Sequence, residues 1–221
     1  ILKEWKNYLK ENLNIYSQVE KAKNLLNNNE KLLIDITKVD NTFFELKSYT
    51  VDVNNEVVNK VAHIEFEKLN SKKVIDNEGK ERDCFIIFWT KYVKFNLGPL
   101  MYDILIEFVS KNNAIICSDR EEVTDSAKNL WNNYLHNRVD VEKAQLDIEN
   151  DNLDPDKFPN LTPQWEDDFY QGLSLIDMSK NNLENWFDSA FSKGYYKLNT
   201  PIIDILNSKS ELEFFTYKEN T

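Results

Sequence analysis

The sequence has little glycine, few cysteines and no surplus of basic residues. Its four glycines form no Gly-x-x-x-x-Gly-Lys run, which excludes the nucleotide-binding P-loop. The two cysteines, Cys84 and Cys117, are too few for a disulfide framework, and no Cys/His spacing suits a zinc centre. Each adjoins a strand-like apolar run, so we predict reduced, buried thiols in a protein of a reducing interior.

The charge balance is acidic. Thirty-eight aspartates and glutamates against 27 lysines and arginines give a formal net charge of −11. No basic surplus exists to neutralise phosphates, so we expect no nucleic-acid partner. The acidic surface is compatible with a cationic small molecule, with a lysine-rich protein, or simply with solubility. No stretch reaches the roughly 20 apolar residues of a membrane span, so we expect no membrane partner.

Hydrophobic periodicity predicts an α+β protein with one main core. A chain of 221 residues with 41% hydrophobic residues is long enough to bury that core. Residues 1–26 follow helical spacing and predict an N-terminal helical pair, whose second helix opens with a capping box at Ser17 and Glu20. Over residues 31–90 the period changes to two, which predicts a meander of strands.

A strand–helix–strand unit follows the meander. Residues 84–89 are continuously apolar, as expected for a central strand buried on both faces. Residues 100–109 form an amphipathic helical pattern behind Gly98 and Pro99. Residues 114–118 are again apolar and predict a short buried strand.

A second helix is predicted over residues 127–135, with Thr124 or Asp125 as its N-cap. A meander followed by one βαβ unit gives a twisted mixed sheet flanked by helices. We therefore predict an α+β domain over residues 1–140, including the N-terminal helical pair.

Beyond residue 140 the composition changes. Residues 147–163 are acidic and contain three of the five prolines, which predicts an extended connection. Thr200 and Pro201 are placed as N-cap and first residue of a short terminal helix. We predict that residues 141–221 form a C-terminal extension that packs on the domain or on a partner, with the aromatic run NWFDSAFSKGYY suited to docking.

A glycine-bearing junction and a helix pattern occur together in FIIFWTKYVKFNLGPLMYDILIEF, AIICSD and TDSAKNLW. This arrangement resembles the GCN5-related N-acetyltransferase (GNAT) superfamily, and the resemblance covers about residues 31–136. In that family the fourth strand ends in a glycine-bearing loop, and amides at the start of the next helix bind the pyrophosphate of acetyl-CoA. The next strand and helix carry a polar–x–x–Ala–x–x–x–Tyr pattern that lies along the pantetheine arm.

A longer pattern is similar to GNAT-like proteins encoded by tailed bacteriophages. It consists of LGPLMYDILIEF…SDREEVTDSAKNLWNNYLHNRVDV, followed later by FSKGYYK. The resemblance implies a GNAT-like fold, acetyl-CoA as cofactor, and a location in the host cytoplasm or in a virion. It also implies a set of cofactor-binding residues: Val93, Phe95, Leu97, Gly98, Leu100 and Met101.

Catalytic residues follow from the same resemblance. Tyr134 would be the general acid that protonates the leaving thiolate. Glu65 or Glu67, on the polar face of the preceding strand, would accept the proton of the acceptor amine, and His63 shares that face. Backbone N–H groups over residues 92–94 would stabilise the oxyanion. Alternating glutamates along a strand usually form its solvent face, which is the alternative interpretation of Glu65 and Glu67.

Asp119 and Arg120 follow the predicted fifth strand and would line the acceptor pocket, or they form a solvated turn before the next helix. Gly98 likewise has two interpretations, a pyrophosphate turn or a tight turn needed only for chain reversal.

The chain departs from the family pattern at three positions. Gly98 is the only glycine of its loop, Pro99 lacks an amide hydrogen, and Trp131 stands where the family often has its tyrosine. Two hypotheses follow. The protein is an acetyl-CoA-dependent N-acetyltransferase with a small-molecule or protein amine as acceptor. Alternatively, it is a non-catalytic structural component, for example of a virion, that reuses the GNAT-like fold and binds protein partners through its C-terminal arm.

Overall fold

The computed structural model describes residues 17–26, 30–118, 123–146, 188–208 and 212–216. The chain divides into two compact units, which are described separately. Unit 1 comprises Ile1–Glu67, Trp89–Phe108 and Asn199–Thr221, and unit 2 comprises Lys68–Phe88 and Val109–Leu198.

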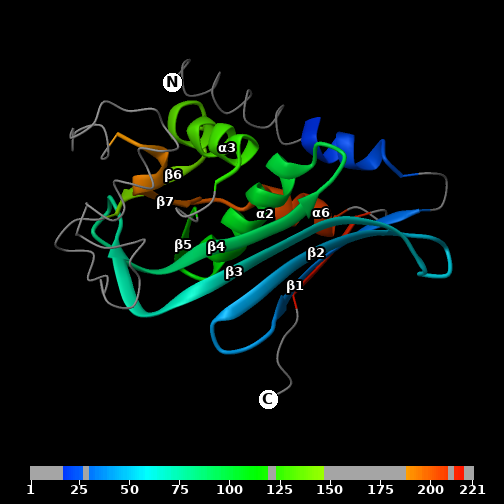
Figure 1. The fold of residues 1–221 in the computed structure, drawn as a ribbon, viewed down its shortest axis with the longest axis horizontal. Helices are drawn as coiled ribbons and strands as arrows, with labels where there is room; N and C mark the ends of the chain where they lie inside the picture. Colours follow the sequence, from blue (N-terminus) through cyan, green and yellow to red (C-terminus); the bar gives the residue numbers. More distant parts are fainter. Residues whose placement is uncertain (1–16, 27–29, 119–122, 147–187, 209–211, 217–221) are drawn as a thin grey trace. The chain divides into compact units, whose positions relative to one another are not determined.

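The sheet of unit 1 is an antiparallel meander with one added parallel strand. Strands β1 (Lys31–Lys38), β2 (Phe43–Val51) and β3 (Val57–Ile75) pair in sequence order and lie side by side (Figure 1). Strand β8 (Leu212–Thr216) pairs with β1 in parallel. The predicted period of two is confirmed, because buried and half-buried residues alternate along β1.

One face of β2 and β3 packs on helix α2 (Gly98–Lys111). The rings of Phe44 and Phe66 stack with centroids 5.4 Å apart, and the Phe108 ring of α2 lies 6.0 Å from Phe66. Burial of a phenylalanine side chain stabilises the fold by roughly 2–3 kcal/mol. The meander and the helix therefore share one aromatic core.

Helix α2 is buried more completely than its amphipathic pattern predicts. Residues 100–107 are all buried, including Asp103 and Glu107, which are 0% exposed. Helix α6 (Pro201–Asn207) accounts for the burial of Glu107. The Glu107 carboxylate accepts hydrogen bonds from the N–H groups of Ile202 at 3.2 Å and Ile203 at 2.9 Å.

The strands of unit 2 form a mixed arrangement in the order β6-β7-β5-β4. Strand β4 (Glu81–Val93) pairs in parallel with β5 (Ala114–Cys117). Strand β7 (Lys193–Tyr196) lies between β5 and β6 (Glu142–Gln145) and is antiparallel to both. The predicted α+β class with a mixed sheet and flanking helices is confirmed.

Helix α3 (Asp125–His136) confirms the second predicted helix of the βαβ region. Of the two candidate caps, Thr124 is the N-cap, and its hydroxyl accepts a hydrogen bond from the Ala127 N–H at 3.3 Å. This bond satisfies one of the N–H groups that have no partner inside the helix.

The predicted burial of residues 84–89 on both faces is only partly correct. Cys84, Phe85 and Ile87 are buried, but Phe88 and Trp89 are 56% and 58% exposed. The paired register with β5 ends at Ile86, opposite Cys117, whereas β4 continues to Val93. Phe88 and Trp89 both lie beyond this paired register.

Both cysteines are buried and neither is disulfide-bonded, as predicted. Cys84 of β4 and Cys117 of β5 lie in the core of unit 2 with their sulfur atoms 3.9 Å apart. The core around them includes Val74, Ile115 and Tyr196.

We expect both thiols to be unreactive in the folded protein, because a buried thiol is inaccessible to a polar disulfide reagent. In native buffer, Ellman's reagent should modify the thiols no faster than unit 2 opens. In denaturant, two equivalents of thiol should react within the mixing time. Rapid modification of either cysteine under native conditions would contradict this burial.

The described part of residues 141–221 supplies β6, β7, α6 and β8, while residues 147–187 lie outside the described ranges. Phe191, Tyr195 and Tyr196 are at most 1% exposed. Of the two predicted alternatives, these three side chains therefore pack inside the protein and are not exposed for docking on a partner. Among the described helices, none is long and apolar enough to cross a membrane.

Candidate functional site

The pairing of β2 with β3 collects polar side chains on one face of unit 1. Glu45 lies opposite Glu65, and Lys47 lies opposite His63. Side chains two residues apart on a strand point to the same face, so all four share it. The other face carries the aromatic core that packs on α2.

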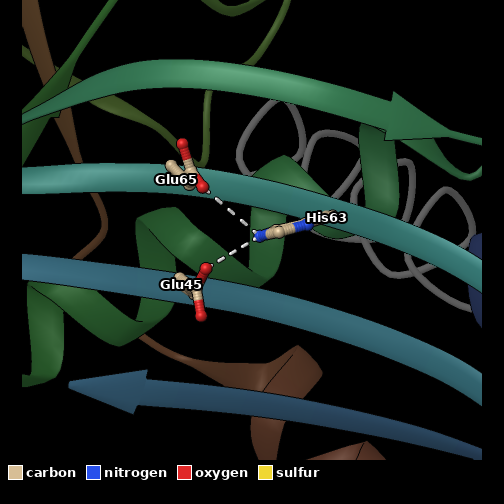
Figure 2. A group of neighbouring side chains, drawn as sticks. All are labelled: Glu45, His63 and Glu65. Carbon is tan, nitrogen blue, oxygen red and sulfur yellow. Dashed lines mark hydrogen bonds and ion pairs between the residues drawn. The ribbon is translucent and has the colours of Figure 1, made fainter. Parts of the chain in front are cut away.

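Glu45, His63 and Glu65 form a compact cluster (Figure 2). The Nε2 atom of His63 lies 3.0 Å from Oε1 of Glu45 and 3.6 Å from Oε1 of Glu65. The side chains of Glu45, His63 and Glu65 are 16%, 14% and 9% exposed. The imidazole therefore lies between two carboxylates in a largely desolvated setting.

Two lysines neutralise these carboxylates. Lys47 binds Oε2 of Glu45, and Lys91 of β4 binds Oε1 of Glu65. Burial by itself raises the pKa of Glu45, but hydrogen bonds from Lys47 and His63 outweigh burial and hold that pKa below its usual value. The hydrogen bond to Glu45 raises the pKa of Lys47 in turn. Glu45 therefore stays ionised at neutral pH.

Sequence reasoning found only part of this cluster. Glu65 and His63 were predicted on the polar face of their strand, and both belong to the cluster. Glu67 lies two residues further along the same face, opposite Phe43. Glu45 and Lys91 were not predicted, since only the strand register brings them to Glu65. Alternation of charge in residues 45–47 is the one local signal that could have indicated Glu45.

The junction between β4 and α2 is a tight turn that does not depend on glycine. The Leu97 N–H donates to the Lys94 carbonyl at 3.2 Å, and the two central residues, Phe95 and Asn96, have φ values of 59° and 56°. Positive φ at both central positions is typical of a type I′ turn. Such a φ is unfavourable for a residue as bulky as phenylalanine. The interpretation of Gly98 as the residue needed for chain reversal is therefore wrong.

Gly98 is instead the first residue of α2, and the space beside it is open. A Cβ atom added to Gly98 would meet no other atom within 4 Å, and Gly98 has no positive φ. Phe95, just before it, is 45% exposed, whereas the side chains of Leu97, Leu100 and Met101 are at most 1% exposed. At Leu97, Leu100 and Met101, therefore, only the backbone can face a ligand.

The first turn of α2 offers two amide donors. The N–H groups of Leu97 and Met101 donate to the carbonyls of Lys94 and Leu97, and Pro99 has no N–H. Gly98 and Leu100 carry the remaining N–H groups, which have no acceptor within α2 itself.

Of the backbone N–H groups predicted to stabilise the oxyanion, at least one is already hydrogen-bonded within the sheet. The Lys94 N–H donates to the Val61 carbonyl at 2.9 Å, as part of the pairing of β4 with β3. Backbone groups of successive strand residues point to opposite edges, so the Val93 N–H points away from β3. Of these two amides, Val93 is the one placed to contact a substrate.

Comparison of the chain with family models, with curated proteins and with solved structures finds no match. The resemblance to the GNAT superfamily therefore stays a prediction from sequence. The chemistry of the site follows from the described residues alone.

Tyr134 belongs to unit 2 and is 0% exposed. Its ring packs on Trp131 and Tyr195 with centroids 5.8 Å and 6.0 Å away, and the Arg138 guanidinium lies 5.4 Å from the ring centre. Its role as general acid stays a prediction, and it requires this aromatic cluster to open. Asp119 and Arg120 lie outside the described residues.

Proposed function

We propose that the chain binds an acyl-CoA thioester and transfers its acyl group to an amine, as a GNAT-like N-acyltransferase. The observation that carries the proposal is the first turn of α2, where the Cβ position of Gly98 is open and the N–H groups of Gly98 and Leu100 have no acceptor within the helix. A helix N-terminus with outward N–H groups favours a phosphate, because its partial positive charge faces the anion. The order β4–turn–α2–β5–α3 supports the proposal, because it is the order on which the family resemblance rests.

The backbone of Gly98 and Leu100 would hold the pyrophosphate, and the exposed Phe95 ring would contact the apolar part of the ligand. The bound thioester would supply the acyl group. Val93 would direct its N–H at the oxyanion that forms during transfer.

Glu65 is the base that the geometry supports best. Lys94 at the turn is hydrogen-bonded to Val61, which lies two residues before His63 on β3. Because a strand rises about 3.3 Å per residue, His63 is only about 7 Å further along the strand. Glu65, with His63 beside it, would accept the proton of the acceptor amine.

The test is a calorimetric titration of acetyl-CoA into the parent protein, Gly98→Ala and Gly98→Glu. The alanine fits the open space and should bind with about the parental affinity. The glutamate is tolerated at a helix N-terminus but places an anion where the pyrophosphate would lie, so binding should fall at least 100-fold. The proposal is wrong if the folded parent does not bind, or if Gly98→Glu binds as well as Gly98→Ala.

A non-catalytic role as a structural or interaction component, for example of a virion, is the second candidate. It is favoured by the complete burial of Tyr134 and by the stacking of Trp131 on Tyr195, with ring centroids 5.1 Å apart. Acetyl-CoA binding without transfer to a panel of polyamines and lysine peptides would favour this candidate. Transfer that is lost in Glu65→Gln would favour the enzyme.

A further inference from the structure

Three side-chain atoms in unit 1 lie near the spacing of ligands around a metal ion, with one distance inside that range and a second slightly longer. Metal–nitrogen and metal–oxygen bonds of about 2.1 Å place neighbouring ligand atoms roughly 3.0–3.4 Å apart at octahedral or tetrahedral angles. Nε2 of His63 lies 3.0 Å from the Glu45 oxygen and 3.6 Å from the Glu65 oxygen. All three ligand atoms lie within 4.8 Å of one another.

The strands hold these ligands in fixed positions. Glu45 and Glu65 are paired across β2 and β3, and His63 is two residues from Glu65 on the same face. Figure 2 shows one oxygen of each carboxylate directed at the same ring nitrogen of His63. A site built on paired strands needs little rearrangement to close around an ion. We propose that Glu45, His63 and Glu65 bind a divalent first-row transition metal ion.

The donor set decides the class of metal. One imidazole nitrogen and two carboxylate oxygens suit zinc, iron(II) or manganese(II), whereas magnesium and calcium prefer oxygen ligands alone. Three protein ligands leave at least one coordination position open for water or for a substrate atom, as in catalytic zinc sites. This proposal does not rest on acyl-CoA binding, although Glu65, the base proposed above, would be one of the metal ligands.

The two lysines have different effects on this site. Lys47 binds the Oε2 atom of Glu45, so Oε1 still faces His63, and such a contact orients a carboxylate that uses one oxygen as ligand. Lys91 binds Oε1 of Glu65, the same oxygen that faces His63. Its ammonium group therefore competes with a metal ion for that oxygen. The Lys91 side chain is 34% exposed, so it has room to move into solvent.

The experiment is a calorimetric titration of Zn²⁺ into the chelator-treated full chain without acyl-CoA, repeated with Mn²⁺ and Mg²⁺. We expect one Zn²⁺ per chain, weaker binding of Mn²⁺ and none of Mg²⁺. Glu45→Gln and His63→Gln should each weaken Zn²⁺ at least tenfold, because each removes a ligand. Lys91→Gln should strengthen Zn²⁺ severalfold, because the competing cation is gone.

His136→Gln is the matched control, because it removes the other of the two histidines, which is exposed near the end of α3. It should bind Zn²⁺ like the parent. Circular dichroism identifies any variant that fails to fold. Glu45→Gln keeps the size of the side chain, so this variant is expected to fold like the parent. The proposal is overturned if neither the parent nor Lys91→Gln binds, or if binding survives in both ligand variants, which would place the ion elsewhere, for example on the two cysteines.

Discussion

Glu107→Ala is expected to lower the free energy of unfolding by about 4 kcal/mol. The Glu107 carboxylate is 0% exposed and accepts hydrogen bonds from the N–H groups of Ile202 and Ile203 at the start of α6. Hydrogen bonds to a charged group contribute roughly 1.5–3 kcal/mol each, and the variant leaves two donors without their acceptor. Urea denaturation followed by circular dichroism measures the loss.

Glu107 takes the place of an N-cap side chain for α6, which has no capping hydrogen bond from its own N-cap residue. Thr200 occupies the N-cap position of α6, but its side chain makes no capping hydrogen bond. Pro201 follows at the first turn and has no N–H to satisfy. The carboxylate of α2 therefore satisfies the next two N–H groups and faces the positive end of the helix.

Thr200→Ala is the matched control for this prediction. Because the Thr200 side chain caps nothing, the substitution should cost less than about 0.5 kcal/mol, well below a functional cap. Glu107→Gln should lie between the two, since an amide keeps one acceptor oxygen but brings an NH₂ group towards a second donor. Equal losses for Glu107→Ala and Thr200→Ala would contradict this account.

Asp76→Ala is expected to destabilise the protein by about 3–4 kcal/mol. In the turn between β3 and β4, Oδ1 of Asp76 accepts hydrogen bonds from the N–H groups of Glu78 and Lys80, both at 2.9 Å. Its Oδ2 accepts one from Arg82 at 2.6 Å, and the Asp76 side chain is 0% exposed. The Arg82 guanidinium also lies 4.0 Å from the centre of the Tyr196 ring. Loss of the carboxylate leaves the buried Arg82 without its counter-ion, and an uncompensated buried charge strongly destabilises the folded state.

The turn between β2 and β3 offers a control of the same geometry. Oδ1 of Asp52 accepts from the N–H groups of Asn54 and Glu56 at 2.8 and 2.9 Å, and this turn is exposed. Asp52→Ala should cost only about 1 kcal/mol, because water can satisfy the released N–H groups. If the two alanine variants lose the same stability, the ion pair with Arg82 contributes nothing.

The contribution of Asp76 should also depend on pH. Burial alone would raise its pKa, but the Lys80 N–H and the Arg82 guanidinium outweigh burial and hold the pKa below the usual 3.8. Because the pKa of Asp76 is lower in the folded than in the unfolded protein, its full stabilising effect is present at pH values above the unfolded-state pKa. The effect is lost as the pH falls through the folded-state pKa. The difference in unfolding free energy between the parent and Asp76→Asn should therefore be largest at neutral pH and shrink towards pH 2. A difference that stays constant would contradict the ion pair.

Local pattern determined most of the secondary structure. The alternation in β1, the helix after Pro99 and the helix capped by Thr124 all follow from neighbours within one or two turns of the chain. Contacts between such close neighbours in sequence form independently of the tertiary structure. The α+β class could be predicted for the same reason, since it depends on the order of elements.

Only the tertiary structure decided which distant groups meet. Glu45 reaches His63 through the register of two strands, and Glu107 caps α6 from 95 residues away. Tyr134 shows the same dependence, because its packing on Trp131 and Tyr195 buries a side chain to which the family resemblance assigned a catalytic role. Sequence spacing fixes the direction of a side chain on its own element. Its partner, its burial and hence its chemistry are set by the elements that the fold places against it.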